Sequence, residues 1–177
     1  MKTALKATAL ALVASAVVAG TALAGPAPQT AAGDALDPRT YDPGSKLALV
    51  AHATGVQKYT CQANGTWLFT DPEATLFKTN GAAHEMGSHF LNFATGRPVW
   101  MLKDGSSVEA ARKVAGNGGA GNIPLLLLQA VATYGDRLGE TTWVQRLSTS
   151  GGVAPAGTCT AGDHAAVPYT ADYYFWK

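Results

Sequence analysis

The chain contains 177 residues, of which 47% are hydrophobic and 14% are charged, and its formal net charge at pH 7 is +1. A chain of this length suits one domain that buries about two-thirds of its unfolded surface. The near-zero charge and the lack of a basic run argue against nucleic acid as a partner.

Residues 1–24 have the features of a secretory signal peptide. Lys2 and Lys6 give the N-terminus a positive charge, and a short apolar stretch follows them from Ala7 to Ala19. Ala22-Leu23-Ala24 then fits a small-residue cleavage site. Cleavage there would remove both lysines and leave residues 25–177 with a formal net charge of −1. We therefore expect an exported protein, either periplasmic or extracellular. The mature chain has no run of about 18 apolar residues, so we expect no membrane span in it.

The segment after the expected cleavage site differs from the rest of the chain. Residues 25–45 are rich in Pro, Ala, Gly and Asp and show no hydrophobic periodicity, which predicts a flexible or loosely docked leader. From residue 46 onward, short apolar stretches alternate with Gly, Asn, Asp and Pro. Residues 46–177 are therefore expected to form a single β-rich domain.

Three dipeptides in this domain predict hairpin turns between strands. They are Asn64-Gly65, Asn80-Gly81 and Asp104-Gly105. Residues 123–135 are ambiguous, because their Leu and Ala content favours a helix while their short length between Gly-rich bounds allows a buried strand. We favour the strand for this segment.

The C-terminus also has the pattern of a strand. Tyr169, Ala171, Tyr173 and Phe175 alternate with the residues between them in a segment rich in aromatic and β-branched residues. Strands at short intervals with repeated turn signals are typical of an all-β fold. We predict an antiparallel β-sandwich or barrel-like single domain with long Gly-rich loops.

Two cysteines, Cys61 and Cys159, remain in the mature chain. An even pair in an exported domain most often forms a disulfide. Closing a loop of about 100 residues contributes on the order of 4–5 kcal/mol in the chain-entropy model. Neither cysteine lies in a C-x-x-C motif, so we expect a structural bond and not a redox-active pair.

Gly116, Gly118 and Gly121 satisfy the G-x-G-x-x-G pattern of dinucleotide-binding folds. That motif needs a buried parallel strand before it and a helix after it. The preceding segment carries Glu109 and Arg112, unlike a strand that is buried on both faces. Too few residues follow Gly121 to complete such a fold, so we expect a surface loop and not an NAD-dependent dehydrogenase.

The histidines are the candidate metal ligands. His84 and His89 stand five residues apart, and His52 is a possible third ligand for a divalent metal. The simpler interpretation is that these histidines form hydrogen bonds in turns or lie on the surface. The four tryptophans and six tyrosines likewise allow two interpretations, a sugar- or phenol-binding surface or, more simply, a core.

Short motifs between Leu47 and Trp176 match a known family. They are Gly55-Val56-Gln57, Tyr59 and Cys61; His84 and Gly87-Ser88-His89; Trp100 and Asp104-Gly105-Ser106; Ile123-Pro124; Val144-Gln145-Arg146, Thr149, Gly151-Gly152, Ala154-Pro155 and Cys159; and Val167-Pro168-Tyr169, Ala171, Tyr173 and Phe175. In these motifs the chain resembles a family of exported bacterial and fungal proteins known as a domain of unknown function, some fungal members of which carry the label malate dehydrogenase. The resemblance implies an exported single domain and supports the pairing of Cys61 with Cys159. It transfers no catalytic residue.

These observations favour a non-enzymatic module that binds an unknown small molecule, a glycan or another component of the cell envelope. The sequence gives no catalytic residue and no cofactor-binding residue to name. The alternative is a metal-binding protein or metalloenzyme with a site centred on His84 and His89. A hydrolase with a non-obvious nucleophile ranks third, because neither Ser88 nor Ser106 lies in a G-x-S-x-G motif.

Overall fold

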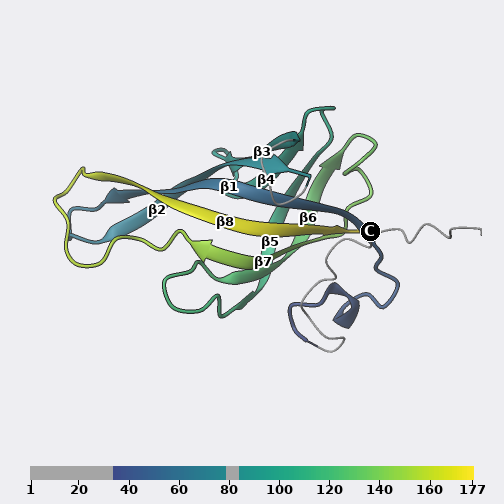
Figure 1. The fold of residues 1–177 in the computed structure, drawn as a ribbon, viewed down its shortest axis with the longest axis horizontal. Coiled ribbons are helices and arrows are strands. Elements are labelled where there is room, and N and C mark those ends of the chain that lie inside the picture. The colour runs from purple at the N-terminus through teal and green to yellow at the C-terminus, as the bar shows by residue number, and fades with distance from the viewer. Residues whose placement is uncertain (1–33, 79–83) are drawn as a thin grey trace, which may run out of the picture.

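Eight antiparallel strands form a closed barrel in the computed structural model, which describes residues 34–78 and 84–177 (Figure 1). The strands are β1 (Leu47–Cys61), β2 (Trp67–Phe77), β3 (Glu85–Asn92), β4 (Arg97–Leu102), β5 (Ser107–Gly116), β6 (Leu125–Tyr134), β7 (Trp143–Gly151) and β8 (His164–Trp176). Each strand pairs with its neighbour in the sequence, and β8 pairs with β1 to close the barrel. The all-β prediction is therefore confirmed, and the architecture is a barrel.

Some of the expectations fall outside the described residues. The signal peptide over 1–24, the first part of the leader over 25–33 and the Asn80-Gly81 turn all belong to this group. Within the described ranges, no helix is long and apolar enough to cross a membrane.

The predictions for one ambiguous segment and two turns are confirmed. The ambiguous segment forms strand β6, and Asn64-Gly65 lies in the turn between β1 and β2. Asp104-Gly105 lies in the turn between β4 and β5. Gly65 and Gly105 have φ angles of 76° and 85°, a left-handed conformation that glycine adopts without steric cost.

The barrel has two different ends, which we call the base and the mouth. The base is the end where β1 begins and β8 finishes, with Leu47 paired to Trp176. The mouth is the opposite end, formed by the β1–β2, β3–β4, β5–β6 and β7–β8 connections. β1 and β8, with 15 and 13 residues, are the longest strands, and together with β2 they extend past the other strands at the mouth (Figure 1).

The predicted disulfide is present at the tip of this extension. Cys61 at the end of β1 is bonded to Cys159 in the connection between β7 and β8, with a Cα–Cα distance of 5.9 Å. The bond therefore ties the end of β1 to the connection between β7 and β8, beyond the mouth.

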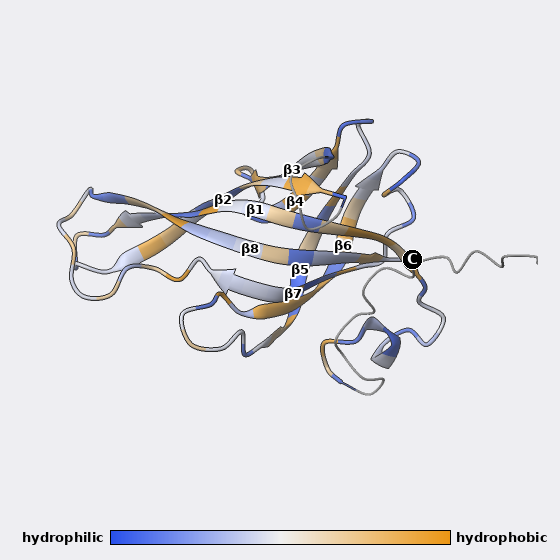
Figure 2. Ribbon diagram, viewed as in Figure 1, coloured by the Kyte–Doolittle hydropathy of each residue, from blue (hydrophilic) through white to orange (hydrophobic). Residues whose placement is uncertain are grey.

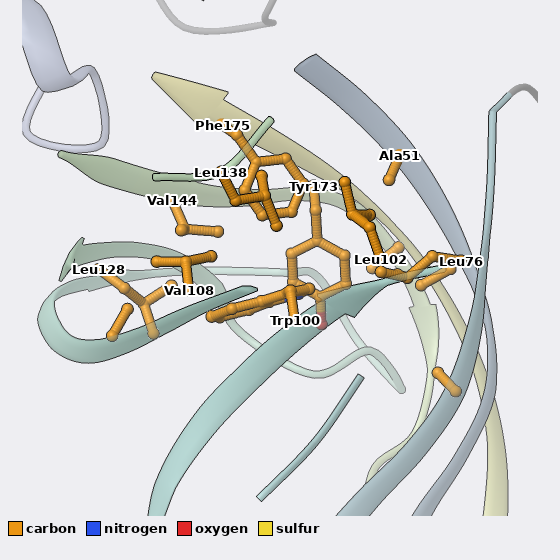
Figure 3. Packing of buried hydrophobic residues seen from close by; sticks show 14 of the residues in the cluster. Ala51, Leu76, Trp100, Leu102, Val108, Leu128, Leu138, Val144, Tyr173 and Phe175 are labelled. Carbon is orange, nitrogen blue, oxygen red and sulfur yellow. The ribbon is translucent and has the colours of Figure 1, made fainter. Parts of the chain in front are cut away.

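Hydrophobic and hydrophilic residues are interleaved along the strands, because each strand has one face inside the barrel and one outside (Figure 2). The alternating residues Tyr169, Ala171, Tyr173 and Phe175 of β8 all belong to the interior cluster. At the base this cluster is entirely apolar. Its largest members there are Leu76, Leu102, Val108, Leu138, Val144 and Phe175 (Figure 3).

A second apolar cluster covers the outside of the barrel over β6, β7 and β8. Leu36 belongs to it together with Leu127 of β6, Trp143 of β7 and Trp176 of β8. Residues 34–45, which include the short 3-10 helix η1 (Pro38–Thr40), lie over this outer face. The buried amide of Gln145 connects the segment 34–45 to the barrel wall. Its Nε2 donates to the Leu36 carbonyl, and its Oε1 accepts from Trp176 Nε1.

Candidate functional site

The three histidines proposed as metal ligands lie in different places. His89 points into the barrel from β3 and is 3% exposed. His52 lies on the outside of β1, where its Nδ1 is 2.8 Å from Asp172 Oδ1. His84 is exposed just before β3 begins. The structure therefore does not bring the three side chains together. Across residues 34–78 and 84–177, no group of three or more His, Cys, Asp or Glu side chains is arranged to hold a metal ion.

The glycine motif lies at the mouth of the barrel. Gly116 ends β5, and Gly118 and Gly121 lie in the loop that leads into β6. A strand follows this motif at the position where a dinucleotide-binding fold needs a helix. Gly118 has a packing role, because a Cβ atom at this position would lie 2.2 Å from the carbonyl oxygen of Ile123.

Toward the mouth, the apolar filling of the barrel gives way to a cavity of about 570 Å³. Eight-stranded barrels have interiors that side chains can just fill or that can hold one small ligand. Part of the wall is aliphatic and comes from Leu91, Ile123, Leu126 and Leu128. A cavity of this volume is within the ordinary range of small-molecule sites.

Three rings form the boundary between the apolar base and the cavity. His89 stacks on Trp100 with a centroid distance of 4.6 Å and an interplanar angle of 6°. Tyr173 lies 5.1 Å from each of these rings. All three side chains line the cavity, and Figure 3 shows Trp100 and Tyr173 side by side in the interior. We call His89, Trp100 and Tyr173 the floor of the cavity.

The floor histidine is neutral. The pKa of His89 is lowered to about 3, mainly by burial and also by the positive charge of Arg146, while the hydrogen bond to Val99 acts in the opposite direction. Its Nδ1 is 2.9 Å from the Val99 carbonyl oxygen. Because a carbonyl can only accept, Nδ1 carries the proton and Nε2 carries the lone pair.

Several polar atoms around the cavity are buried without a partner. Among the described residues, Gln57 Nε2, Trp100 Nε1 and the Tyr173 hydroxyl, on side chains that line the cavity, have no hydrogen-bond partner in standard geometry, and neither does the nearby Tyr169 hydroxyl. The Tyr169 hydroxyl is nevertheless close enough to Gln57 and Tyr173, and the Tyr173 hydroxyl to Arg146, for these groups to influence the pKa of the phenols. One more atom of this kind in the described residues, Ser45 Oγ, lies away from the cavity, just before β1 at the base. Buried polar atoms normally have partners, and leaving one unsatisfied costs about 1–3 kcal/mol. Burial raises the pKa of Tyr169 and Tyr173, so both phenols stay protonated and can donate.

The charged residues that line the cavity are all arginines. They are Arg97, Arg112 and Arg146, and no Asp or Glu lines the cavity with them. Arg97 lies 3.6 Å from Glu109 at the edge of the mouth. Arg146 donates two hydrogen bonds to the Pro124 carbonyl oxygen, from Nε at 3.0 Å and from Nη2 at 2.9 Å. The cavity therefore combines aliphatic walls, hydrogen-bond donors and positive charge.

Sequence reasoning assigned no role in a site to Gln57, Arg112 or Arg146. Gln57 lies an even number of residues from the buried Ala53 on β1, and Arg146 lies two residues from the buried Val144 on β7. Residues two apart on a strand share a face, so this spacing was the signal that could have placed both side chains inside. Register shifts on both sides of the segment from residue 110 to residue 112 obscure the same signal for Arg112.

Comparison with known proteins gives one match. The model of the family DUF3455, described as a protein of unknown function, matches residues 42–177. The matched region includes all eight strands of the barrel. No curated protein and no solved structure matches the chain.

Proposed function

We propose that this chain, which belongs to the DUF3455 family of proteins of unknown function, binds a small molecule in the cavity at the mouth of its barrel. The observation that carries the proposal is the cavity of about 570 Å³, whose wall combines aliphatic side chains with the guanidinium groups of Arg112 and Arg146. The apolar body of a ligand would cover the aliphatic part of this wall, and acceptor groups on the ligand would meet the N–H groups of the arginines. These N–H groups would fix its orientation.

The shape of the site supports a small molecule as the ligand. The floor of His89, Trp100 and Tyr173 lies inside the barrel, and the aliphatic wall surrounds the space above it. A glycan chain or an envelope protein would contact an outer surface and would leave this interior space unfilled. A small molecule of matching size would bury most of its surface there.

We also propose that binding takes place outside the cytoplasm. Residues 1–24 have the composition of a secretory signal peptide. The Cys61–Cys159 disulfide is typical of oxidising compartments. Expression with and without residues 1–24, followed by fractionation, tests this part. Retention of the full-length chain in the cytoplasm would contradict it.

A neutral fluorescent probe tests the binding site itself. N-phenyl-1-naphthylamine fluoresces strongly when it leaves water for an apolar site, and we expect saturable binding of about one molecule per chain. Leu126→Trp places a large side chain in the cavity, and we expect it to weaken binding at least tenfold. Val131→Trp is the matched control, because Val131 is 48% exposed and lies on the same strand.

The result that would overturn the proposal is equal binding by wild type and a folded Leu126→Trp variant, or binding that does not saturate. A thermal melt establishes whether the variant folds. If it does not, Leu91→Trp repeats the test at another lining position, two residues from the interior His89 on β3, where the side chain is half-buried.

A further inference from the structure

The mouth of the barrel holds positive charge that no protein carboxylate balances. Arg112 and Arg146 both line the cavity. In the two described ranges, 34–78 and 84–177, neither guanidinium forms an ion pair, whereas Arg97 at the same mouth is paired with Glu109. Arg112 is exposed and Arg146 is half-buried, so an anion that enters the cavity can reach both guanidinium groups.

Hydrogen bonds hold the guanidinium group of Arg146 at the cavity wall, where its charge affects groups inside the barrel. Its two hydrogen bonds to the Pro124 carbonyl fix the guanidinium and use two of its five N–H groups. Its charge also reaches across the cavity. Burial raises the pKa of Tyr59 and Tyr173, and the charge of Arg146 opposes this rise in both groups.

The neutral polar groups favour the same type of ligand. Gln57 Nε2 and Trp100 Nε1 can only donate hydrogen bonds, and their side chains are 3% and 1% exposed. The hydroxyl of Tyr173 is unpartnered beside them and can also donate. The unpartnered nitrogen atoms beside the cavity are therefore both donors. An oxyanion, which offers only acceptors, complements such a set.

The remainder of the wall is apolar. Ile123, Leu126 and Leu128 line the cavity together with the ring of Phe69. A free inorganic anion would leave these side chains facing an empty or water-filled space. A ligand with an apolar body and an anionic group would use both parts of the site.

We propose that the ligand is an amphipathic organic anion whose oxyanion group binds Arg112 and Arg146 while its apolar body fills the space between the aliphatic wall and the Trp100 floor. This inference rests on the proposed function and specifies the charge class of the ligand. It can fail while the proposed binding site stands.

Two probes with the same aromatic skeleton separate the two claims. 8-Anilinonaphthalene-1-sulfonate carries a sulfonate, and N-phenyl-1-naphthylamine carries no charge. We expect the wild type to prefer the sulfonate at low ionic strength, with the preference shrinking as salt is added. The Arg112→Gln variant should lower sulfonate affinity about tenfold and change the affinity for the neutral probe less than twofold.

Further variants complete the test. Arg146→Gln should act like Arg112→Gln, and Arg146→Lys, which keeps the charge, should restore part of the sulfonate affinity. Arg137→Gln is the control, because Arg137 lies in the β6–β7 connection at the base, near Asp104. Its sulfonate affinity should equal that of the wild type.

Each outcome decides between the claims. If the neutral probe binds in the cavity and the arginine variants lower both affinities equally or neither, the anion inference is wrong and the binding site stands. If Leu126→Trp affects neither probe, no ligand enters the cavity and both proposals are wrong.

Discussion

At the base of the barrel, Leu76, Leu102 and Phe175 fill the interior with apolar atoms, and each is at most 2% exposed. Toward the mouth, the same barrel wall contributes the unpartnered Nε2 of Gln57 and the unpartnered Nε1 of Trp100. Interior packing of the first kind stabilises a fold, and buried unsatisfied groups of the second kind destabilise it. The comparison indicates that the base stabilises the barrel, and the less favourable packing lies at the mouth, where we propose that a ligand binds.

The largest expected effect comes from removing a packed ring at the base. Phe175→Ala should lower the free energy of unfolding by about 3–5 kcal/mol, because it leaves a cavity among fully buried neighbours. Phe69→Ala is the matched change at the mouth, where the ring is 40% exposed, and it should cost about 1 kcal/mol or less. Urea denaturation measures both. Equal losses would contradict the distinction between base and mouth.

A smaller effect on the free energy of unfolding is expected when the pH is lowered, because His89 lies in the floor between these two regions. Burial lowers the pKa of His89 to about 3, below the value of about 6.5 in the unfolded chain. The unfolded state therefore binds the proton more tightly. The stability contribution of neutral His89 is complete above pH 6.5 and is lost as the pH falls toward 3. Between pH 6.5 and pH 4.5 the loss should be about 2–3 kcal/mol.

The His89→Gln variant isolates this contribution, since glutamine can still donate to Val99 and does not titrate. Its stability should decline less steeply than that of the wild type over the same pH range. Lowered pKa values of Asp37 and Glu109, each caused first by side-chain hydrogen bonds, add further losses at lower pH, which is why the window stops at 4.5. Parallel curves for the two proteins would show that His89 is not the titrating group.

The smallest effects are expected when the hydroxyl group is removed from either of two tyrosines on the inner face. The change in the free energy of unfolding should differ in sign between them. Tyr59 donates a hydrogen bond to the Gly152 carbonyl at 2.6 Å, and Tyr59→Phe should cost about 1–2 kcal/mol. The Tyr173 hydroxyl has no partner, and Tyr173→Phe should be neutral or stabilise by up to about 1 kcal/mol. Thermal and urea unfolding measure both. A loss at Tyr173 as large as that at Tyr59 would show that its hydroxyl already has a structural partner.

The sequence was sufficient for the strands, two of the turns and the disulfide, because these depend on local pattern and on one pair of cysteines. Alternation along residues 169–175 marks the inner face of β8 directly. Asp104-Gly105 fixes a turn because glycine adopts its positive φ angle at low cost.

The candidate site could not be predicted in the same way, because closure of the barrel decides which inner faces meet. His89 was proposed as a metal ligand together with His84. In the structure His89 is buried inside the barrel, and His84 is exposed outside it. Trp100 and Tyr173 come from strands far apart in the sequence and meet only when β8 and β4 share one interior. The separation of these residues along the sequence does not indicate that their side chains are in contact.

The most direct test of the ligand-binding mouth is the indole N–H signal of Trp100 in a two-dimensional ¹H–¹⁵N NMR spectrum, recorded as 8-anilinonaphthalene-1-sulfonate is added. Trp100→Phe assigns the signal. We predict a saturable shift of the Trp100 signal, while Trp143 and Trp176 in the outer cluster keep theirs. An unmoved Trp100 signal at saturation, or shifts confined to Trp143 and Trp176, would contradict a ligand site at the mouth of the barrel.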